Sequence, residues 1–490
     1  MLSVLNPLQQ LRPSSKPLKT VSLARGAQGS QAIIAKLDKP LVSTEYINAH
    51  LELLPVFHKV HHAIQPGGVT INPTTNMPIV SEAQALFTAR AQHRFDLWIS
   101  RILRRPGRDP SSPFEEAELP PVDVLMFLHA YMLSPWNYYE DSKRVYPELE
   151  AMGSFPFGFA RALVDVATLE LVPTPAQIAM WESQTSTTFA IPLQTLPAET
   201  VLLCCPKCDS EVRLPWVNEA GTGYGQRLFK ATCSQCNLNI DRDALSLSKL
   251  LRDISSPRIM AHTLLSRSGV ADLASAQEFS LAIKEELGLP RSSDGDQFNW
   301  KVSVVESILT RDVKSDGVKK KLLHILKAYH HPSESSLDLG QAFLRQARFI
   351  SEMDRIQWSG SKASFPGKEA ALEDAVERYH KFVALDPVAM VACLDIDLAF
   401  HTHQLLGPTF AQDSINILGR LLDHDDSVER HVIIDDLTRT SEVWEEAYAS
   451  AYVPRFPPLL QANKPCTNSC SMVGSTPGEY EEISLKKKRN

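Results

Sequence analysis

Apolar residues recur at helical spacing along most of this chain. The segment 81–103 shows the pattern clearly. Its apolar positions at near-helical spacing are Ala85, Phe87, Phe95, Trp98 and Ile102. A stripe of this kind lets a helix bury one face while the other stays in water. The pattern predicts a mainly α fold.

Local signals place the ends of several predicted helices. A helix over 41–66 is expected to begin at the cap Ser43-Thr44-Glu45 and to stop at Pro66-Gly67-Gly68. Another is expected to open at Pro173-Thr174-Pro175, because proline is favoured in the first turn. Further helices are predicted over 120–134, 156–169, 337–353, 369–384, 394–405 and 438–448.

Two of the predicted helices share a pattern, which indicates an internal duplication. The segment Pro121–Leu133 can be overlaid on Cys393–Leu405, and a proline and an aromatic residue follow each copy. The matched pairs are Asp123 with Asp395, His129 with His401, and Tyr131 with His403. A shorter upstream match aligns 93–95 with 380–382. Repeats of this kind predict two related helical units, one in each half of the chain.

Near Val201 the pattern changes to short alternating segments that are typical of β structure. This stretch carries two Cys-x2-Cys pairs separated by 24 residues: Cys205, Cys208, Cys233 and Cys236. Four thiolates at this spacing can close a tetrahedral structural zinc site, whose ion would supply folding free energy to a small β insertion. The alternative is four free or partly oxidised thiols. Cys204 is interpreted as a spare thiol.

Histidines and acids of the second copy form a weaker candidate site. On one helix, Asp397 and His401 are four residues apart and share a face, whereas His403 points elsewhere. His129 occupies the matching place in the first copy, where Leu125 replaces Asp397. A metal site is one interpretation. The alternative is that these histidines are buried residues that hydrogen-bond their neighbours.

The run His424, Asp425 and Asp426 could complete a divalent-metal site with His401 or His403. The competing interpretation is a helix N-cap cluster, since Asp is common at caps. A non-haem iron facial triad is disfavoured, because only His431 follows as a further ligand. The spacing of His58 and His62 also permits a metal, with a solvated helix face as the alternative.

Composition narrows the functional class. The 490 residues carry a formal net charge of −7, which gives no general affinity for nucleic acid or anionic membranes. No apolar run reaches the length of a membrane span. The clustering of the eight cysteines points to metal binding in a reducing compartment. We therefore expect a cytoplasmic or nuclear protein, with a mitochondrial location as the alternative because the first 37 residues lack acids.

The predicted organisation has six segments. It runs as a disordered basic tail, a first helical unit, a zinc-ribbon-like insertion, a helical connector, a second helical unit and a disordered tail. The ranges are 1–40, 41–200, 201–245, 246–368, 369–456 and 457–490. The fold class is therefore mainly α, with two duplicated helical units and a small β zinc-ribbon insertion. Cys466 and Cys470 lie in the last segment and have no predicted role.

Several motifs in this order resemble the glycine-rich domain-containing protein-like family of fungi and plants, over about residues 45–455. They are Lys59–Gln65, the duplicated Asp-x5-His, Phe400–Leu405, Asp423–Asp426, and Trp444-Glu445 with Tyr448. The Cys-x2-Cys pairs resemble the fungal branch. The resemblance implies a stress or regulatory role and no established reaction. RNA binding, suggested for some plant members, is not carried over, because glycine is only 21 of 490 residues here.

Two functional hypotheses follow. The first is a non-enzymatic scaffold or adaptor, with structural zinc and a helical groove for a protein partner. The second is a metal-dependent enzyme whose site lies on the second helical unit. Convergence of three or more of the named His and Asp side chains in an open cleft would favour the enzyme.

Overall fold

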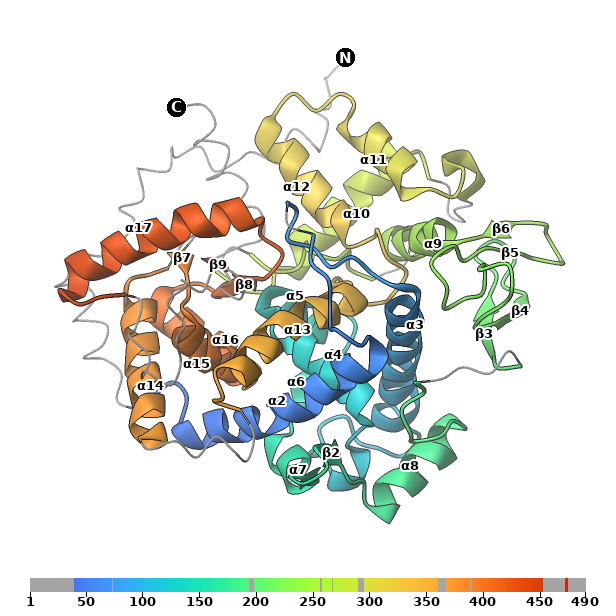
Figure 1. Ribbon diagram of the computed structural model, residues 1–490. Coiled ribbons are helices and arrows are strands. Elements are labelled where there is room, and N and C mark those ends of the chain that lie inside the picture. The colour runs from blue at the N-terminus through green and yellow to red at the C-terminus, as the bar shows by residue number, and fades with distance from the viewer. Residues whose placement is uncertain are drawn as a thin grey trace. The chain divides into compact units, whose positions relative to one another are not determined.

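The computed structural model describes residues 39–452 apart from gaps at 73, 194–197, 256–257, 267, 290–294, 360–366 and 388–389, together with residues 472–474. These residues are mainly helical with a few short strands, which confirms the predicted class at this level (Figure 1). Most of the predicted tails, and with them Cys466 and Cys470, lie outside the described residues. None of the described helices is both long and apolar enough to span a membrane.

The contacts group the chain into two compact units. The first contains Glu140–Val145 and the described residues between 198 and 338. The second contains the described residues before 140, the segment Tyr146–Leu193, and the described residues from Leu339 onward. The predicted β insertion therefore falls in the first unit, and both helices of the predicted duplication fall in the second.

The second unit is organised around α13 (Leu339–Arg355), which packs against α2 (Thr44–Ile64), α3 (Glu82–Leu97) and α4 (Val122–Met132) (Figure 1). Its buried face carries Phe343, Phe349 and Ile350, among other residues. The remaining helices of this unit are η2 (Trp98–Leu103), η3 (Glu116–Glu118), the start of α5 (Pro135–Arg144), α6 (Pro147–Met152), α7 (Phe157–Ala162), α8 (Pro175–Thr185), α14 (Lys368–Ala384), α15 (Leu394–Gln404), α16 (Pro408–Leu418) and α17 (Arg430–Tyr448).

Two small sheets complete the second unit. Strands β1 (Val164–Asp165) and β2 (Glu170–Leu171) form an antiparallel hairpin. Strand β9 (Met472–Gly474) lies between β7 (Met390–Val391) and β8 (Asp423–Asp425), antiparallel to both. Strand β9 lies within the segment 457–490, for which the sequence analysis predicted a disordered tail.

The first unit joins a small β module to a helical core. Strands β3 (Thr200–Cys204) and β4 (Glu211–Pro215) pair antiparallel, as do β5 (Ala231–Thr232) and β6 (Asn239–Ile240). The helices are the end of α5, α9 (Arg242–Ser255), α10 (Leu273–Glu286), η4 (Gly295–Phe298), α11 (Val302–Thr310) and α12 (Asp316–Lys327). Buried leucines, isoleucines and aromatic residues of α9 to α12 form its apolar core.

The predicted helix starts are confirmed by their caps. The Ser43 hydroxyl accepts a hydrogen bond from the Tyr46 amide at 3.4 Å at the start of α2. Thr174 and Gln177 form a reciprocal capping box at the start of α8, where Pro175 is the first helical residue. Each cap satisfies amides that the helix itself cannot pair.

Two sequence predictions of helical structure are wrong. The helix predicted over 156–169 ends at Ala162, and a hairpin follows. The Asp165 carboxylate accepts hydrogen bonds from the amides of Ala167 and Thr168, which stabilises a turn in place of a further helical turn. The run Asp423–Asp426 does not cap a helix, because its first three residues form β8 and α17 starts only at Arg430.

Two buried arginines of the second unit have matching surroundings. The Arg94 Nε donates to Asp123 at 2.7 Å, and its guanidinium lies 4.7 Å from the Trp181 ring centre. The Arg378 Nε donates to Asp395 at 2.5 Å, and its guanidinium lies 5.0 Å from the ring centre of Trp444. The shorter upstream match aligned Arg94 with Lys381, but the structure gives the matching contacts to Arg378. The residue of the second copy that corresponds to Arg94 in its contacts is therefore Arg378, and not Lys381 as the sequence match indicated.

Candidate functional site

The four cysteines of the two Cys-x2-Cys pairs lie together in the first unit. Their sulfur atoms all lie within 4.8 Å of one another. The Cys205 and Cys236 sulfurs are 3.6 Å apart, as are those of Cys208 and Cys233. A tetrahedral ion with bonds of about 2.3 Å places its sulfur ligands about 3.8 Å apart. The donor set and spacing therefore fit a four-coordinate thiolate site. Cys204 is exposed and is not part of this group.

The two cysteine turns have the same backbone geometry. In the first, the Asp209 amide donates to the Cys205 carbonyl at 3.0 Å, and Asp209 has φ +55°. In the second, the Asn237 amide donates to the Cys233 carbonyl at 3.0 Å, and Asn237 has φ +59°. Asp and Asn tolerate positive φ better than most residues. In each turn two backbone amides also donate to the first sulfur. Burial nevertheless raises the pKa of the Cys205 thiol to about 12, whereas the Ser210 hydroxyl and the two amides lower the pKa of Cys233 to about 6.

A second group of candidate ligands lies in the second unit. Asp397 and His401 come from α15, and His424 comes from β8. The His401 Nε2 lies 3.4 Å from the Asp397 Oδ1 and 3.0 Å from the His424 Nε2. The His424 Nε2 lies 3.9 Å from the same carboxylate oxygen. All three side chains are almost fully buried.

Contacts outside the group fix the His424 ring. Its Nδ1 lies 2.8 Å from the backbone carbonyl of Leu133. Because a carbonyl oxygen can only accept, the Nδ1 carries a proton in this contact. The backbone of His424 is paired with Val473 of β9. An outer hydrogen bond of this kind sets the orientation and tautomer of metal-binding histidines.

His129, predicted as part of the same site, has a different partner. Its Nε2 lies 2.9 Å from the Nε2 of His50, whose Nδ1 lies 3.0 Å from the Thr402 hydroxyl. Sequence analysis did not select His50, because nothing in the local pattern of α2 links it to a residue 79 positions away. The two imidazole pairs, His50 with His129 and His401 with His424, therefore form separate contacts.

His403 is placed outside the group. It points away from His401, as helical geometry predicted, and lies 2.9 Å from the Tyr379 hydroxyl through its Nδ1. Its Nε2 lies 3.2 Å from the carboxylate of Asp413. Both ring nitrogens thus have local partners, which is the behaviour of a buried residue that links helices.

Asp425 and Asp426 are also placed outside the group. The Asp425 carboxylate accepts hydrogen bonds from the amide and hydroxyl of Ser427. The Asp426 carboxylate accepts from Arg345 at 2.6 Å and from Gln346 at 3.0 Å. The run therefore contributes only His424. Alternation along β8 places Asp425 on the face opposite His424, and Asp426 lies beyond the strand with its carboxylate held by Arg345 and Gln346.

Burial keeps the histidines of both pairs neutral. It lowers the pKa of His50 to about 3. Burial, followed by the charge of its neighbour, lowers the pKa of His129 and of His401 well below the ordinary value. Burial also lowers the pKa of His424. Neutral imidazole is the form that binds metal ions.

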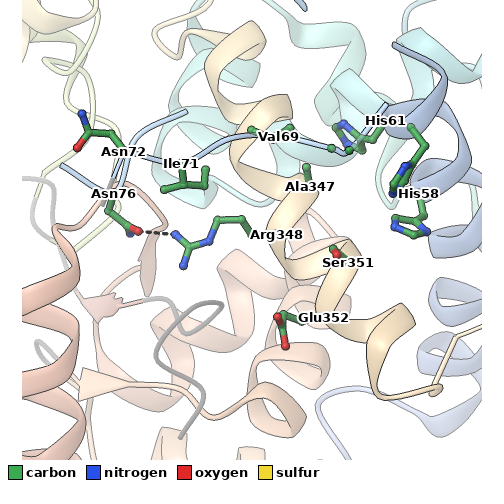
Figure 2. A pocket seen from close by; sticks show the side chains of 13 residues that line it. His58, His61, Val69, Ile71, Asn72, Asn76, Ala347, Arg348, Ser351 and Glu352 are labelled. Carbon is green, nitrogen blue, oxygen red and sulfur yellow. Dashed lines mark hydrogen bonds between the residues drawn. The ribbon is translucent and has the colours of Figure 1, made fainter. Parts of the chain in front are cut away.

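A cavity of about 330 Å³ lies between the end of α2, the loop after it and α13 (Figure 2). His61 on its wall is 4% exposed, and neither ring nitrogen has a hydrogen-bond partner among the described residues. Burial lowers the pKa of His61 to about 3. Arg348, on the α13 side, donates to the amide oxygen of Asn76 at 2.5 Å. The predicted pair His58 and His62 also lines this cavity, but no described third donor completes a metal site there.

A second hollow is apolar. Its volume is about 470 Å³, and its walls come from α2, the hairpin β1–β2, α8 and the segment after α8. Leu193 on its wall is 51% exposed, and Pro120, Pro121 and Pro173 also line it. We call this hollow the apolar groove.

Comparison with known proteins finds similarity over one part of the chain. The glycine-rich domain-containing protein-like family model matches residues 306–413. The match covers the second of the two similar helices, with Asp395, Asp397, His401 and His403, and is shorter than the resemblance predicted over 45–455. Two Arabidopsis thaliana relatives also match. No solved structure matches the chain.

The two relatives are similar only over a short segment. Glycine-rich domain-containing protein 1 is 28% identical over 127 residues, which is 24% of this chain and 14% of the relative. Glycine-rich domain-containing protein 2 is 27% identical over 130 residues, which is 24% of this chain and 16% of the relative. The matched part thus spans under a fifth of either relative, and neither relative's name states an activity.

Proposed function

We propose that this protein is a non-enzymatic helical scaffold or adaptor that carries a structural zinc ion and binds a protein partner. The observation that carries the proposal is the apolar groove of the second unit. An open hollow lined mainly by aliphatic side chains and prolines fits an extended apolar peptide better than a charged metabolite. The exposed Leu193 offers apolar area that such a peptide would bury.

The cysteine cluster supports the structural half of the proposal. Four sulfur ligands would fill every position of a tetrahedral zinc ion, which leaves none for a substrate. The small β3–β6 module has short strands, so a bound ion would contribute much of its stability. Sulfur ligands of this kind also support the expected cytoplasmic or nuclear location. The Cys-x2-Cys pairs support placing the chain in the fungal branch.

The predicted duplication is part of the proposal. The contacts of Arg94 with Asp123 and Trp181 have counterparts in those of Arg378 with Asp395 and Trp444. In each set the indole donates to a hydroxyl six residues later, to Thr187 in the first and Ser450 in the second. Each tryptophan helix also ends on a left-handed residue, Ser186 or Ala449. Agreement at several side chains supports two copies of one helical unit.

The groove can be tested with one pair of variants. In cells that express the full chain, proteins cross-linked to Lys59 at the groove are identified and then purified. Leu193→Asp should weaken binding of such a partner at least tenfold, because a charge would enter the apolar surface. Leu281→Asp is the control, since Leu281 is similarly exposed in the other unit. Equal affinity for both variants would contradict the groove as the binding site.

The metal-dependent enzyme is the second candidate, and the convergence of Asp397, His401 and His424 favours it. The enzyme hypothesis expects three or more of the named His and Asp side chains to converge in an open cleft. The three side chains do converge, but their residues are only 0–4% exposed. Deep burial does not suit a site that must admit a substrate, and the scaffold is therefore the better supported function.

A further inference from the structure

We infer that Asp397, His401 and His424 bind one divalent metal ion, a zinc ion by the chemistry of their donor atoms. This site would be separate from the four-cysteine cluster. It goes beyond the proposed scaffold, which does not depend on it. The ligand atoms are the Asp397 Oδ1 and the Nε2 atoms of the two histidines.

The distances define a position for the ion. A triangle with sides of 3.0, 3.4 and 3.9 Å has a circumradius of about 2.0 Å, so one point lies at a Zn–N or Zn–O bond length from all three atoms. A tetrahedral ion with such bonds spaces its ligand atoms about 3.4 Å apart, close to the mean of these sides. An octahedral ion with bonds of about 2.1 Å spaces neighbouring ligands only about 3.0 Å apart. The His401–His424 distance of 3.0 Å fits either geometry, so the choice of zinc rests on the donor set, because two imidazoles and one carboxylate suit zinc.

The hydrogen bonds are those of a metal site. Since the His424 Nδ1 donates to the Leu133 carbonyl, the neutral ring has its lone pair on Nε2, facing Asp397 and His401. If His401 instead donated from its Nε2 to His424, its Nδ1 would be a buried acceptor, and this atom has no partner among the described residues. With an ion at Nε2 the His401 proton lies on Nδ1, which again has no partner among the described residues, so that atom does not decide between the two states. The support for the ion is that both Nε2 atoms face each other and the Asp397 carboxylate.

The first imidazole pair provides an internal comparison. His50 and His129 approach each other through their Nε2 atoms at 2.9 Å, nearly as His401 and His424 do. The residue that matches Asp397 in the first copy is Leu125, so this pair has no carboxylate in that position. Two neutral nitrogens are a poor ligand set for zinc, and His50 Nδ1 has Thr402 as a partner. We therefore assign the ion to the second pair only.

Three protein ligands leave the fourth position of a tetrahedral ion to a water molecule. Both the two-histidine, one-carboxylate set and the neutral imidazoles suit zinc. The ligands come from α15 and from β8, so the ion would cross-link the helix to the small sheet. The substitution Asp397→Asn changes the charge of one ligand and almost nothing of its shape, and it is therefore the variant of choice.

The test counts metal ions in the full chain. The protein is stripped with a chelator under reducing conditions, dialysed against zinc alone, and analysed by mass spectrometry of the elements. The wild type should hold two zinc ions per chain, and Asp397→Asn should hold one. His129→Gln is the matched control and should hold two. One zinc per wild-type chain, or two in Asp397→Asn, would overturn the assignment.

A spectroscopic measurement on the wild-type chain tests the site even if the Asp397→Asn variant does not fold. Cobalt is titrated into the stripped wild-type chain. The four-thiolate site should give intense sulfur-to-metal charge-transfer absorption, and a second equivalent should add ligand-field bands without it. Absence of a second bound equivalent would overturn the site. Loss of the thiolate bands with retention of the second set would instead contradict the structural zinc of the proposed function, so the two failures are distinguishable.

Discussion

The guanidinium of Arg94 contacts both carboxylate oxygens of Asp123, at 2.7 and 3.4 Å, inside the second unit. Both side chains are almost completely buried. The same relationship joins Arg378 to Asp395 at the matching place of the second similar helix. A buried ion pair adds little stability relative to apolar residues, but removing one partner leaves the other charge buried and unpaired.

Breaking the second pair should be costly. We expect Arg378→Met to lower the free energy of unfolding by about 3–5 kcal/mol, because the Asp395 carboxylate would lose its buried partner. Urea titration followed by circular dichroism measures this change. Arg161→Met is the control: Arg161 pairs with Glu52 at the surface, and an exposed pair contributes about 0–1 kcal/mol. A loss below 1 kcal/mol in Arg378→Met would show that the buried pair does not hold α14 to α15.

Removal of zinc should selectively loosen the cysteine module. We expect a chelator with a reductant to make residues 198–255 sensitive to protease, and added zinc to reverse this, because structural zinc supplies folding free energy. Cys205→Ser should show the same sensitivity without chelator. Cys204→Ser is its control, since this neighbouring thiol is exposed and lies outside the cluster. Equal behaviour of the two serine variants would contradict the assigned ligands.

The cavity histidine should be a source of instability. Replacing His61 by Phe should raise the free energy of unfolding by about 1 kcal/mol, because a buried imidazole without partners is exchanged for an apolar ring that can stack on Phe343. Thermal unfolding measures the effect. His62→Phe should give no gain, since that side chain is exposed. A clear destabilisation by His61→Phe would indicate that the imidazole has a bound partner in solution.

Acid should destabilise the first unit through His262. Burial lowers the pKa of His262 in the folded state to about 3, from an ordinary value of 6.5. Between these two pH values the His262 side chain is protonated in the unfolded chain but not in the folded one. Its contribution to the free energy of unfolding is therefore fully present above about pH 6.5 and is lost as the pH falls toward 3. This residue contributes up to about 1.4 kcal/mol per pH unit.

His262→Asn tests this dependence. Asparagine tolerates the positive φ of +61° at this position and does not titrate in this range. Urea unfolding at several pH values should give a shallower loss of stability for the variant between pH 6.5 and 3. Parallel curves for the variant and the wild type would rule out His262 as the source.

Several features could be predicted from sequence because they depend on neighbours along the chain. The starts of α2 and α8 follow from side chains that reach amides three residues later. The grouping of the cysteines followed from the Cys-x2-Cys spacing, since each pair forms its own tight turn. Asp397 and His401 share a face and His403 does not, as helical periodicity requires.

Other features could not be predicted from sequence. The sequence left open whether His424 would join His401 or His403, and the structure places it with Asp397 and His401, on β8, whose backbone pairs with β9. His50 meets His129 across two packed helices. Both contacts involve residues that no local spacing relates. The helix predicted over 156–169 failed for a different reason, because hydrogen bonds from Asp165 to the backbone competed with the helical ones.

The sequence by itself determined the helical class, the main helix starts, the pairing of the cysteines in tight turns and the similarity of the α4 and α15 segments. Each of these depends on interactions within a few residues of the chain. Only the tertiary structure decided which imidazoles meet, which arginine pairs with Asp395, and that Asp425 and Asp426 stay away from His401. Those outcomes depend on how helices and strands pack, and many sequences with the same local pattern could pack differently.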